Sequence, residues 1–323
     1  MSEMHLISAS RKTDIPTFYM DWFMRRIADG KAYVYNAYRK EAKAVSLAPD
    51  QVGAIVFWSK NYRPALPHLK RLHEMGYRMF FHYTITGQLR VTEKYVASTT
   101  QNIEMFQSLA KTFSPEQMQW RFDPIFYTKS MGKAYYLEAF ERIASELSGY
   151  TKRCSISFVT LYPKVKRKLN RELDEDYPVE IPLAERLELT AALQKVAARY
   201  GMQLFSCCQD ELCSIDGVKK GSCIDAQHLS EIFQIPHIYP KRPTRESCGC
   251  YESYDIGYYN TCPHGCVYCY ANVSHASALR NYKMHCAEAP LIAGDVEVSV
   301  LKQEKDGNGN VRVSNGEQLS LFD

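Results

Sequence analysis

Three cysteines lie close together in the stretch YNTCPHGCVYCYAN at residues 259–272. Cys262, Cys266 and Cys269 follow the spacing C-x3-C-x2-C. Thiolate sulfur binds zinc and iron, and one loop of this kind supplies three of the four ligands that a structural zinc or a [4Fe–4S] cluster takes. Three thiolates on a [4Fe–4S] cluster leave one iron open to a substrate or cofactor. The loop predicts a metal centre, with a structural zinc and a purely electron-carrying cluster as alternatives.

The other cysteines indicate a second metal site. The chain has eleven cysteines in 323 residues, and six of them fall between Cys248 and Cys286. An odd number without a secretory signal argues against a disulfide framework, so clustering favours metal binding. We expect Cys154 to be a small core residue. A second, fully ligated [4Fe–4S] cluster, or a zinc site with the same ligands, is predicted at Cys208 (or Cys207), Cys223, Cys248 and Cys250.

Alternating strand-like and helix-like runs must position these loops. Strands are expected at 5–10, 32–38, 54–58, 78–85, 119–123, 154–159, 202–207 and 253–259. Helices are expected at 16–28, 62–75, 92–112, 131–148 and 183–200. Such alternation is typical of parallel βα units, and up to eight strands predict an α/β fold of the TIM-like barrel type.

Composition sets the expected domain organisation and location. Hydrophobic residues make up 46% of the chain, which permits a large core, and the net charge of +4 excludes a protein-wide field for binding polyanions. Residues 1–290 are expected to form one barrel domain with the cysteine loops at 207–269, and the polar stretch 291–323 a flexible tail. No apolar run is long enough to span a membrane and the start lacks a secretory signal, so a cytoplasmic protein is expected.

Polar side chains follow several of the expected strands. Ser10 closes the first, Lys60 follows 54–58, and Arg121 and Asp123 close 119–123. The carboxyl ends of barrel strands form one face, where active sites lie. We expect Lys60 and Ser10 to contact a cofactor or substrate, and Arg121 and Asp123 to position substrate or handle protons. Taken one by one, each residue is better explained by the polarity of loops, whereas the set as a whole favours a site.

The cysteine loop resembles the signature of the radical S-adenosylmethionine (radical SAM) superfamily. The resemblance rests on the cysteine spacing, on Tyr268 before the third cysteine, and on the strand-like stretch before the loop and the helix-like stretch after it. It implies a [4Fe–4S] cluster on Cys262, Cys266 and Cys269, with S-adenosylmethionine on the open iron and Tyr268 beside the adenine. The reduced cluster then cleaves S-adenosylmethionine, and the radical produced abstracts hydrogen from a substrate. A reductant such as flavodoxin or ferredoxin becomes an implied partner.

The position of the loop differs from that of typical radical SAM proteins, in which it follows the first barrel strand. A circular permutation reconciles the two if residues 253–259 form that strand and pair beside 5–10. The whole chain also resembles a bacterial family of unassigned function, DUF1848, through ISASRKTDIP, VFWSKN, WRFDPIF and the two late cysteine loops. That resemblance implies kinship with radical SAM enzymes of the spore photoproduct lyase type.

The final residues suggest a partner. The tail ends in an apolar pentapeptide that resembles the motif by which bacterial proteins bind the DNA polymerase sliding clamp: Gln318, Leu319, Ser320, Leu321 and Phe322. A short peptide on a mobile tether suits such docking. The alternative is that the tail folds back onto the protein. Clamp binding would make DNA the substrate, and the basic stretches 164–168 and 241–245 are candidate phosphate contacts.

Together these features predict a radical SAM iron–sulfur enzyme that repairs or modifies DNA at the replication clamp. Two alternatives stay open. One is a radical SAM enzyme that acts on RNA, a peptide or a small molecule. The other is a metal-stabilised DNA-binding accessory protein without catalytic activity.

Overall fold

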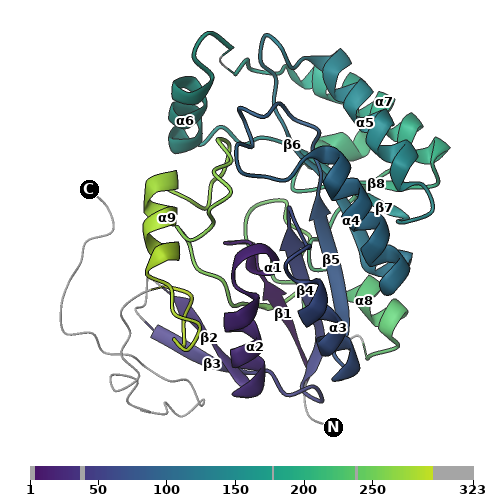
Figure 1. The fold of residues 1–323 in the computed structure, drawn as a ribbon. Helices are drawn as coiled ribbons and strands as arrows, with labels where there is room; N and C mark the ends of the chain where they lie inside the picture. Colours follow the sequence, from purple (N-terminus) through teal and green to yellow (C-terminus); the bar gives the residue numbers. More distant parts are fainter. Residues whose placement is uncertain (1–3, 37–40, 177, 237–238, 294–323) are drawn as a thin grey trace.

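The computed structural model describes residues 4–36, 41–176, 178–236 and 239–293 (Figure 1). The strands are β1 (His5–Ala9), β2 (Lys31–Asn36), β3 (Glu41–Ser46), β4 (Val52–Ser59), β5 (Met79–Thr84), β6 (Met118–Ile125), β7 (Arg153–Phe158), β8 (Gln203–Ser206), β9 (Val218–Lys220) and β10 (Tyr254–Asp255). The α-helices are α1 (Ile15–Phe18), α2 (Met20–Ala28), α3 (Leu66–Glu74), α4 (Thr99–Thr112), α5 (Lys133–Leu147), α6 (Pro163–Leu173), α7 (Leu183–Arg199), α8 (Ala226–Phe233) and α9 (His275–Lys283). Three short 3-10 helices cover Pro115–Gln117, Asp174–Asp176 and Asp210–Ser214.

Eight strands form one parallel sheet in the order β10-β1-β4-β5-β6-β7-β8-β9. The late strand β10 pairs with β1, with Ile7 opposite Tyr254 and Ser8 opposite Asp255. The predicted pairing of 253–259 beside 5–10 is therefore confirmed, although the strand itself is only two residues long. The fold is α/β with a large parallel sheet. β9 and β10 are the edge strands, and no pairing joins them in the part of the chain that the structure describes.

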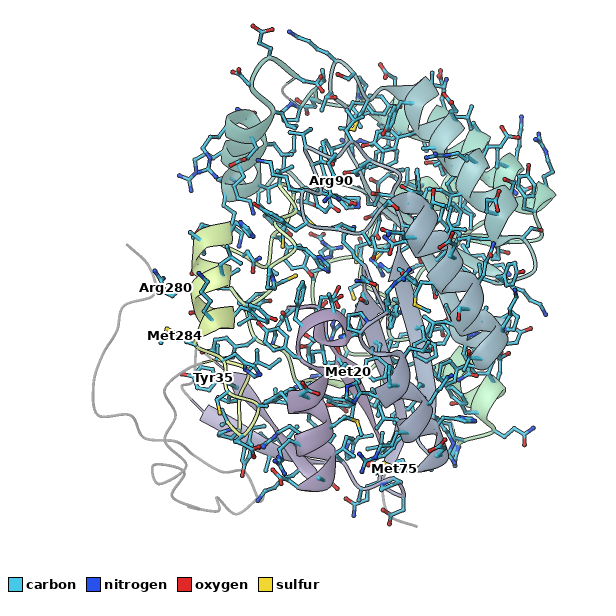
Figure 2. All side chains as sticks on the ribbon, in the orientation of Figure 1. Met20, Tyr35, Met75, Arg90, Arg280 and Met284 are labelled. Carbon is cyan, nitrogen blue, oxygen red and sulfur yellow. The ribbon has the colours of Figure 1, made fainter. Side chains whose placement is uncertain are left out.

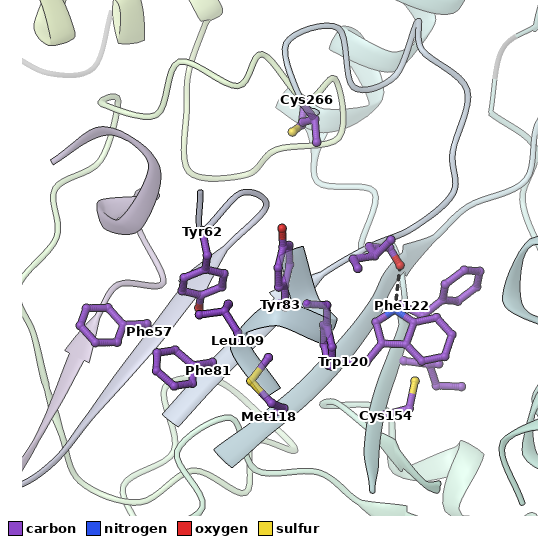
Figure 3. Close-up of a cluster of buried hydrophobic side chains, with 14 of the residues drawn as sticks. Phe57, Tyr62, Phe81, Tyr83, Leu109, Met118, Trp120, Phe122, Cys154 and Cys266 are labelled. Carbon is purple, nitrogen blue, oxygen red and sulfur yellow. Dashed lines mark hydrogen bonds between the residues drawn. The ribbon is translucent and has the colours of Figure 1, made fainter. Parts of the chain in front are cut away.

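One face of the sheet carries the main core. Alternate residues of the strands, such as Phe57, Phe81 and Trp120, are fully buried there against α2, α3, α4, α5 and α7 (Figures 1 and 3). Trp120 stacks on Phe140 of α5 at 4.7 Å between ring centroids. The expectation for Cys154 is confirmed, since its side chain lies in this core with no exposed surface.

The opposite face of the sheet changes from apolar to polar along the strands. Val56 of β4 and Phe80 of β5 lie on this face in one buried cluster with Ile224, which precedes α8, and Leu229 of α8. Two residues further along β5 on the same face lies His82, because side chains alternate between faces in a strand. Because α8 and its approach cover only part of this face, the polar side chains near the carboxyl ends of the strands remain available for a site.

The antiparallel hairpin of β2 and β3 corrects one prediction. Residues 32–38 were expected to form a strand of the barrel, but β2 pairs only with β3 in a separate two-stranded sheet. The alternation of apolar and polar residues that suggested a strand was right, while the parallel pairing was wrong. Tyr35 stacks on Tyr258 at 5.9 Å, so the hairpin contacts the segment after β10 (Figure 2).

The predicted helices are present with shifted ends. The expected helix 16–28 is divided at Tyr19 into α1 and α2. The expected helix 92–112 begins only at Thr99, because Ser98 and Gln101 form a capping box that fixes its start. Helix α7 stops before Gly201, as expected, with that glycine at φ +73°. The sequence interpretation missed β3, β9, α6 and α8.

No helix of the described segments combines the length and the apolar character needed to cross a bilayer.

Candidate functional site

A cavity of about 580 Å³ opens at the carboxyl ends of the parallel strands. All twelve predicted site residues of the described segments line it: Ser10, Lys60, Arg121, Asp123, Cys208, Cys223, Cys248, Cys250, Cys262, Cys266, Tyr268 and Cys269. Cys207 is an eighth cysteine on its wall, and none of the chain's cysteines forms a disulfide. The predicted clamp-binding peptide at 318–322 lies outside the described residues.

The three-cysteine loop is tied down by backbone contacts. The amide of Cys269 donates to the carbonyl of Cys266 at 3.1 Å, and Val267 donates to Thr92 at 3.1 Å. Gly265 has φ +68°, and a Cβ there would lie 2.8 Å from the Tyr95 ring. Only glycine therefore fits this turn without displacing its neighbour. Burial raises the pKa of the free Cys266 thiol to about 12, although the positive charge of Lys60 acts in the opposite direction.

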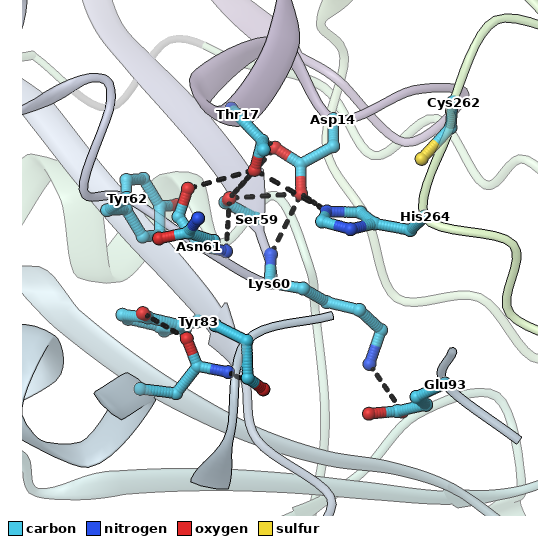
Figure 4. Close-up of polar contacts among 12 residues, drawn as sticks. Asp14, Thr17, Ser59, Lys60, Asn61, Tyr62, Tyr83, Glu93, Cys262 and His264 are labelled. Carbon is cyan, nitrogen blue, oxygen red and sulfur yellow. Dashed lines mark hydrogen bonds and ion pairs between the residues drawn. The ribbon is translucent and has the colours of Figure 1, made fainter. Parts of the chain in front are cut away.

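Asp14 anchors this loop to the sheet (Figure 4). Its buried carboxylate accepts from the amide of Thr17 at 2.9 Å, from the hydroxyl of Ser59 at 2.8 Å and from the amide of Lys60 at 2.9 Å. The Nε2 of His264, between the first two cysteines of the loop, lies 2.8 Å from the same carboxylate. Burial alone would raise the pKa of Asp14, but His264 and the surrounding donors lower it. The side chain stays charged and fixes the loop against β4.

Glu93 is a second buried anchor, and the sequence interpretation missed it. Its carboxylate accepts from Lys60 Nζ at 2.8 Å, from Thr86 Oγ1 at 2.9 Å and from the hydroxyl of Tyr268. The Lys60 ammonium also lies 5.6 Å from the centre of the Tyr268 ring. Burial would lower the pKa of Lys60, but the charge of Glu93 raises it. No pattern in the sequence pointed to Glu93, because it lies in a turn before α4.

Ser10 serves the junction of β1 and β10. Its hydroxyl donates to Asp255 at 2.7 Å, and Ser8 donates to the other oxygen of the same carboxylate at 2.6 Å. The amide of Arg11 donates to Asp255 at 2.9 Å. A Cβ at Gly257 would lie 1.9 Å from Ser10 Oγ, so the two segments approach each other closely. This network holds the strand that leads into the three-cysteine loop.

Five sulfur atoms form the other wall of the cavity. Cys207 Sγ lies 3.9 Å from Cys208 Sγ and 3.5 Å from Cys223 Sγ. Further side-chain contacts join Cys223 to Cys250, Cys250 to Cys248 and Cys248 to Cys208, which closes a ring. Consecutive side chains of a strand point to opposite sides. Cys208 instead has φ +56°, and this left-handed conformation turns both adjacent cysteines into the cavity.

Two glycines bring the segments of this second set together. A Cβ at Gly249 would lie 2.7 Å from Ser222 Oγ, and a Cβ at Gly221 would lie 2.8 Å from the carbonyl oxygen of Ser206. Ser222 also donates to the carbonyl of Gly249 at 2.7 Å. Because glycine has no Cβ, it allows the backbone segments that carry these cysteines to approach this closely.

Arg121 contacts the second cysteine set. Its Nη1 donates to Cys223 Sγ at 3.1 Å, while its Nε donates to Asp123 at 3.1 Å. Burial would lower the pKa of Arg121, but the Asp123 carboxylate raises it far above the usual value. A fixed positive charge therefore faces the sulfur atoms. Arg245 adds another, because its side chain contacts Cys208.

His82 supports the same region from the sheet. Its Nε2 lies 2.7 Å from the carbonyl oxygen of Cys223, and its ring stacks on Trp58 at 4.9 Å. Burial, together with the nearby charge of Arg121, lowers the pKa of His82 to about 3. The imidazole is neutral at ordinary pH and acts as a packing and hydrogen-bonding group.

The fit of the cavity to a metal rests on its donor chemistry. In the described segments, no group of three or more His, Cys, Asp or Glu is gathered as the ligands of a single metal ion. The walls nevertheless carry eight free thiols, glycine cradles, and cations placed beside sulfur. These features suit thiolate-bound iron–sulfur groups, whose potential depends on nearby charge and on hydrogen bonds to sulfur. The assignment of individual ligands stays a prediction.

The fold and the cavity define the class of protein: an α/β protein whose parallel sheet carries a cysteine-lined cavity at the carboxyl ends of its strands. The chain belongs to the family described as a domain of unknown function, DUF1848, which matches residues 6–271. This match spans both cysteine sets. No curated protein matches the chain.

Proposed function

We propose that this protein is an iron–sulfur enzyme of the radical SAM type that acts on DNA. One observation carries the proposal: two separate sets of free thiols line a single cavity at the carboxyl ends of a parallel sheet. Buried thiols without disulfide partners, facing a cavity with charged residues, suit catalysis better than a purely structural metal, whose ligands usually enclose it.

The three-cysteine loop would hold the catalytic cluster through Cys262, Cys266 and Cys269. A [4Fe–4S] cluster with an open iron, once it has bound S-adenosylmethionine, supplies one-electron cleavage that generates a hydrogen-abstracting carbon radical. The remaining thiols, with Cys207 now added to the four predicted residues, would hold the second metal group. Tyr268 would border the bound adenine.

The protein's own residues would orient and enclose these groups. Glu93 fixes Tyr268 and Lys60, and Asp14 fixes His264, so the loop is held by two buried carboxylates. Lys60, held in place by its ion pair with Glu93, would contact the cofactor or substrate. Arg121 would neutralise charge at the second thiol set, in place of the substrate contact expected from sequence alone.

The sheet order supports a permuted barrel. β10, the strand that leads into the three-cysteine loop, lies beside β1 and would correspond to the first strand of a radical SAM barrel. In a parallel sheet a strand can occupy the same place whether it comes first or last in sequence, provided that its connections remain on the surface.

DNA as the substrate rests on surface chemistry and on the tail. The basic stretch 164–168 lies in α6, and 241–245 leads to the second cysteine set. At the mouth of the cavity Arg245 contacts Tyr162, the residue that precedes α6. The pentapeptide at 318–322 would bind the sliding clamp and bring the enzyme to replicating DNA.

The catalytic part is tested by anaerobic incubation of the reduced full chain with S-adenosylmethionine, with and without DNA. We expect cleavage products that disappear in a Cys266→Ala variant. Cleavage with no dependence on DNA, but stimulated by RNA or a peptide, would favour the alternative substrates. No cleavage, together with DNA binding, would favour a metal-stabilised accessory protein.

The clamp is tested separately by deleting residues 318–323. We expect binding to a purified bacterial sliding clamp to disappear while thermal stability is unchanged. Full retention of clamp binding by the shortened chain would refute this role of the tail.

A further inference from the structure

Exposed tyrosines gather at the mouth of the cavity. Five tyrosines of the described segments are exposed as large apolar side chains, and three of them line the cavity: Tyr162 (41% exposed), Tyr259 (49%) and Tyr270 (47%). The other two, Tyr95 and Tyr282, lie elsewhere on the surface. Aromatic rings left in water around one opening indicate a surface that binds something flat and apolar.

Each of these three rings has a basic residue beside it. The Lys12 ammonium lies 5.6 Å from the centre of the Tyr259 ring. The Tyr270 hydroxyl donates to the backbone carbonyl of Arg11 at 3.1 Å, and Arg245 contacts Tyr162. Proteins that bind single-stranded nucleic acid combine aromatic platforms for the bases with cations for the phosphates. The mouth repeats this combination at Tyr259 with Lys12 and at Tyr162 with Arg245.

The surroundings of the mouth extend the positive charge. Helix α6 begins directly after Tyr162 and exposes Lys166 and Arg167. Near it in the fold, Lys241 and Arg242 are exposed just before Arg245, although Arg242 pairs with Glu252. A backbone of phosphates at the mouth would pass these cations and Lys12, while its bases face the tyrosines.

The requirement for an open ring face selects a single strand over a duplex. In a duplex both faces of each base are covered by neighbouring bases, so stacking on tyrosine requires a base that is unpaired or extruded. The proposed function assigns the cavity below the rings, of about 580 Å³, to the metal groups and S-adenosylmethionine. The unpaired nucleotides would therefore be bound at its mouth.

We propose that Tyr162, Tyr259 and Tyr270 form a stacking mouth that binds unpaired nucleotides of single-stranded DNA, with Lys12 and Arg245 on the phosphates. The inference rests on the proposed function in taking DNA as the substrate. It adds which form of DNA is bound and which residues bind it.

Fluorescence anisotropy tests this inference on the anaerobically purified full chain. The probes are a labelled mixed-sequence DNA oligonucleotide, the same sequence as a duplex, and the same sequence as RNA. The variants are Tyr162→Ala, Tyr259→Ala and Tyr270→Ala, with Tyr282→Ala as the matched control at an exposed ring that does not line the cavity. Tyr259→Phe and Tyr270→Phe keep the ring and remove only the hydroxyl.

We expect the single strand to bind more tightly than the duplex. Each alanine variant should weaken single-strand binding by roughly tenfold, because one base–aromatic stack is lost. The phenylalanine variants should bind like the wild type, because they keep the ring, and so should Tyr282→Ala. Lys12→Gln should reduce the salt dependence of binding by about one phosphate contact.

Each other result decides against the inference in a distinguishable way. Wild-type binding to single-stranded DNA without any loss in the three alanine variants, or with an equal loss in Tyr282→Ala, overturns the stacking mouth and leaves the DNA substrate standing. Tighter binding of the duplex than of the single strand likewise overturns the stacking mouth and leaves the DNA substrate standing. Preference for RNA, or no binding to any probe, overturns both the mouth for DNA and the proposed DNA substrate, while leaving the cluster chemistry to its own tests.

Discussion

The two cysteine sets on the cavity wall are built in different ways. Cys262, Cys266 and Cys269 come from one loop, which is held from below by the buried carboxylates of Asp14 and Glu93. The five thiols of the second set come from three segments of chain. They are brought together by glycines and face the positive charges of Arg121 and Arg245.

This difference suggests different tasks for the two sets. A loop tied to acidic residues and to Lys60 can be oriented toward a substrate, and its three thiols leave one cluster position open. A ring of five thiols beside fixed cations can satisfy every position of a cluster. We therefore interpret the first set as the catalytic site, and the second as an electron-carrying or structural site.

The largest expected effect comes from Cys266→Ala. Loss of one of only three ligands should abolish the catalytic cluster, remove roughly four irons per chain and reduce S-adenosylmethionine cleavage to background. Iron analysis and product chromatography measure this. Cys286→Ala, at an exposed thiol that does not line the cavity, is the matched control and should behave as wild type. Unchanged iron in Cys266→Ala would contradict the assignment.

The counterpart in the second set is the double variant Cys223→Ala/Cys250→Ala, because a single exchange would leave four of the five thiols. We expect loss of the second metal group only, with roughly four irons retained at the catalytic loop and its spectral response to S-adenosylmethionine intact. Metal analysis with electron paramagnetic resonance (EPR) checks the result. If zinc is lost in place of iron, the second set is a zinc site. If both groups disappear together, the two sets are not independent and the comparison fails.

A smaller effect is expected from Glu93→Gln. The exchange leaves the Lys60 ammonium buried without its counter-charge, which should cost about 3–5 kcal/mol of the free energy of unfolding. Urea denaturation of the metal-free protein measures it. The matched control is Glu172→Gln, which removes a carboxylate from ion pairs with exposed Lys94 and Arg171 and should cost less than about 1 kcal/mol. Equal effects of the two variants would show that Glu93 is no special anchor.

The smallest effect is expected from Asp255→Asn at the strand that leads into the catalytic loop. Weaker hydrogen bonds to Ser8, Ser10 and Arg11 should cost about 1.5–3 kcal/mol. Burial would raise the pKa of Asp255, but Lys12 and Arg11 lower it below its ordinary value near 3.8. The charged Asp255 therefore stabilises the fold fully at pH values above its ordinary pKa. This stabilisation is lost as the pH falls through the lowered pKa of the folded state.

Unfolding measured at several pH values tests the sign of this effect. The wild type should lose stability below about pH 4 more steeply than Asp255→Asn. Parallel curves for the two proteins would show that Asp255 is not charged in the fold.

Much of this architecture could be predicted from local sequence patterns. Short stretches of sequence are enough to predict the strands β4, β5 and β6 from their apolar runs and the end of α7 from its glycine, because burial and turn geometry depend on neighbouring residues. The spacing in the three-cysteine loop is likewise local. The pairing of β10 with β1 followed from treating the late strand as a displaced first strand, and it is confirmed.

The remaining features depend on contacts between distant segments. Glu93 looks like any acidic residue of a turn until Lys60 and Tyr268 are brought beside it. The strand end placed Arg121 at the site, but its contact with Cys223 could not be predicted, because the two residues are 102 apart in sequence. Cys207 joins the second set only because Cys208 adopts a left-handed conformation. Antiparallel pairing of β2 with β3 could not be told from parallel pairing by alternation alone.

The most direct test of the central claim is the metal content of the anaerobically purified protein, followed by EPR of the reduced sample before and after addition of S-adenosylmethionine. The account predicts about eight irons and a matching amount of sulfide per chain, with a spectrum that changes when S-adenosylmethionine binds an open iron. Zinc without iron, or iron whose spectrum is indifferent to S-adenosylmethionine, would contradict it.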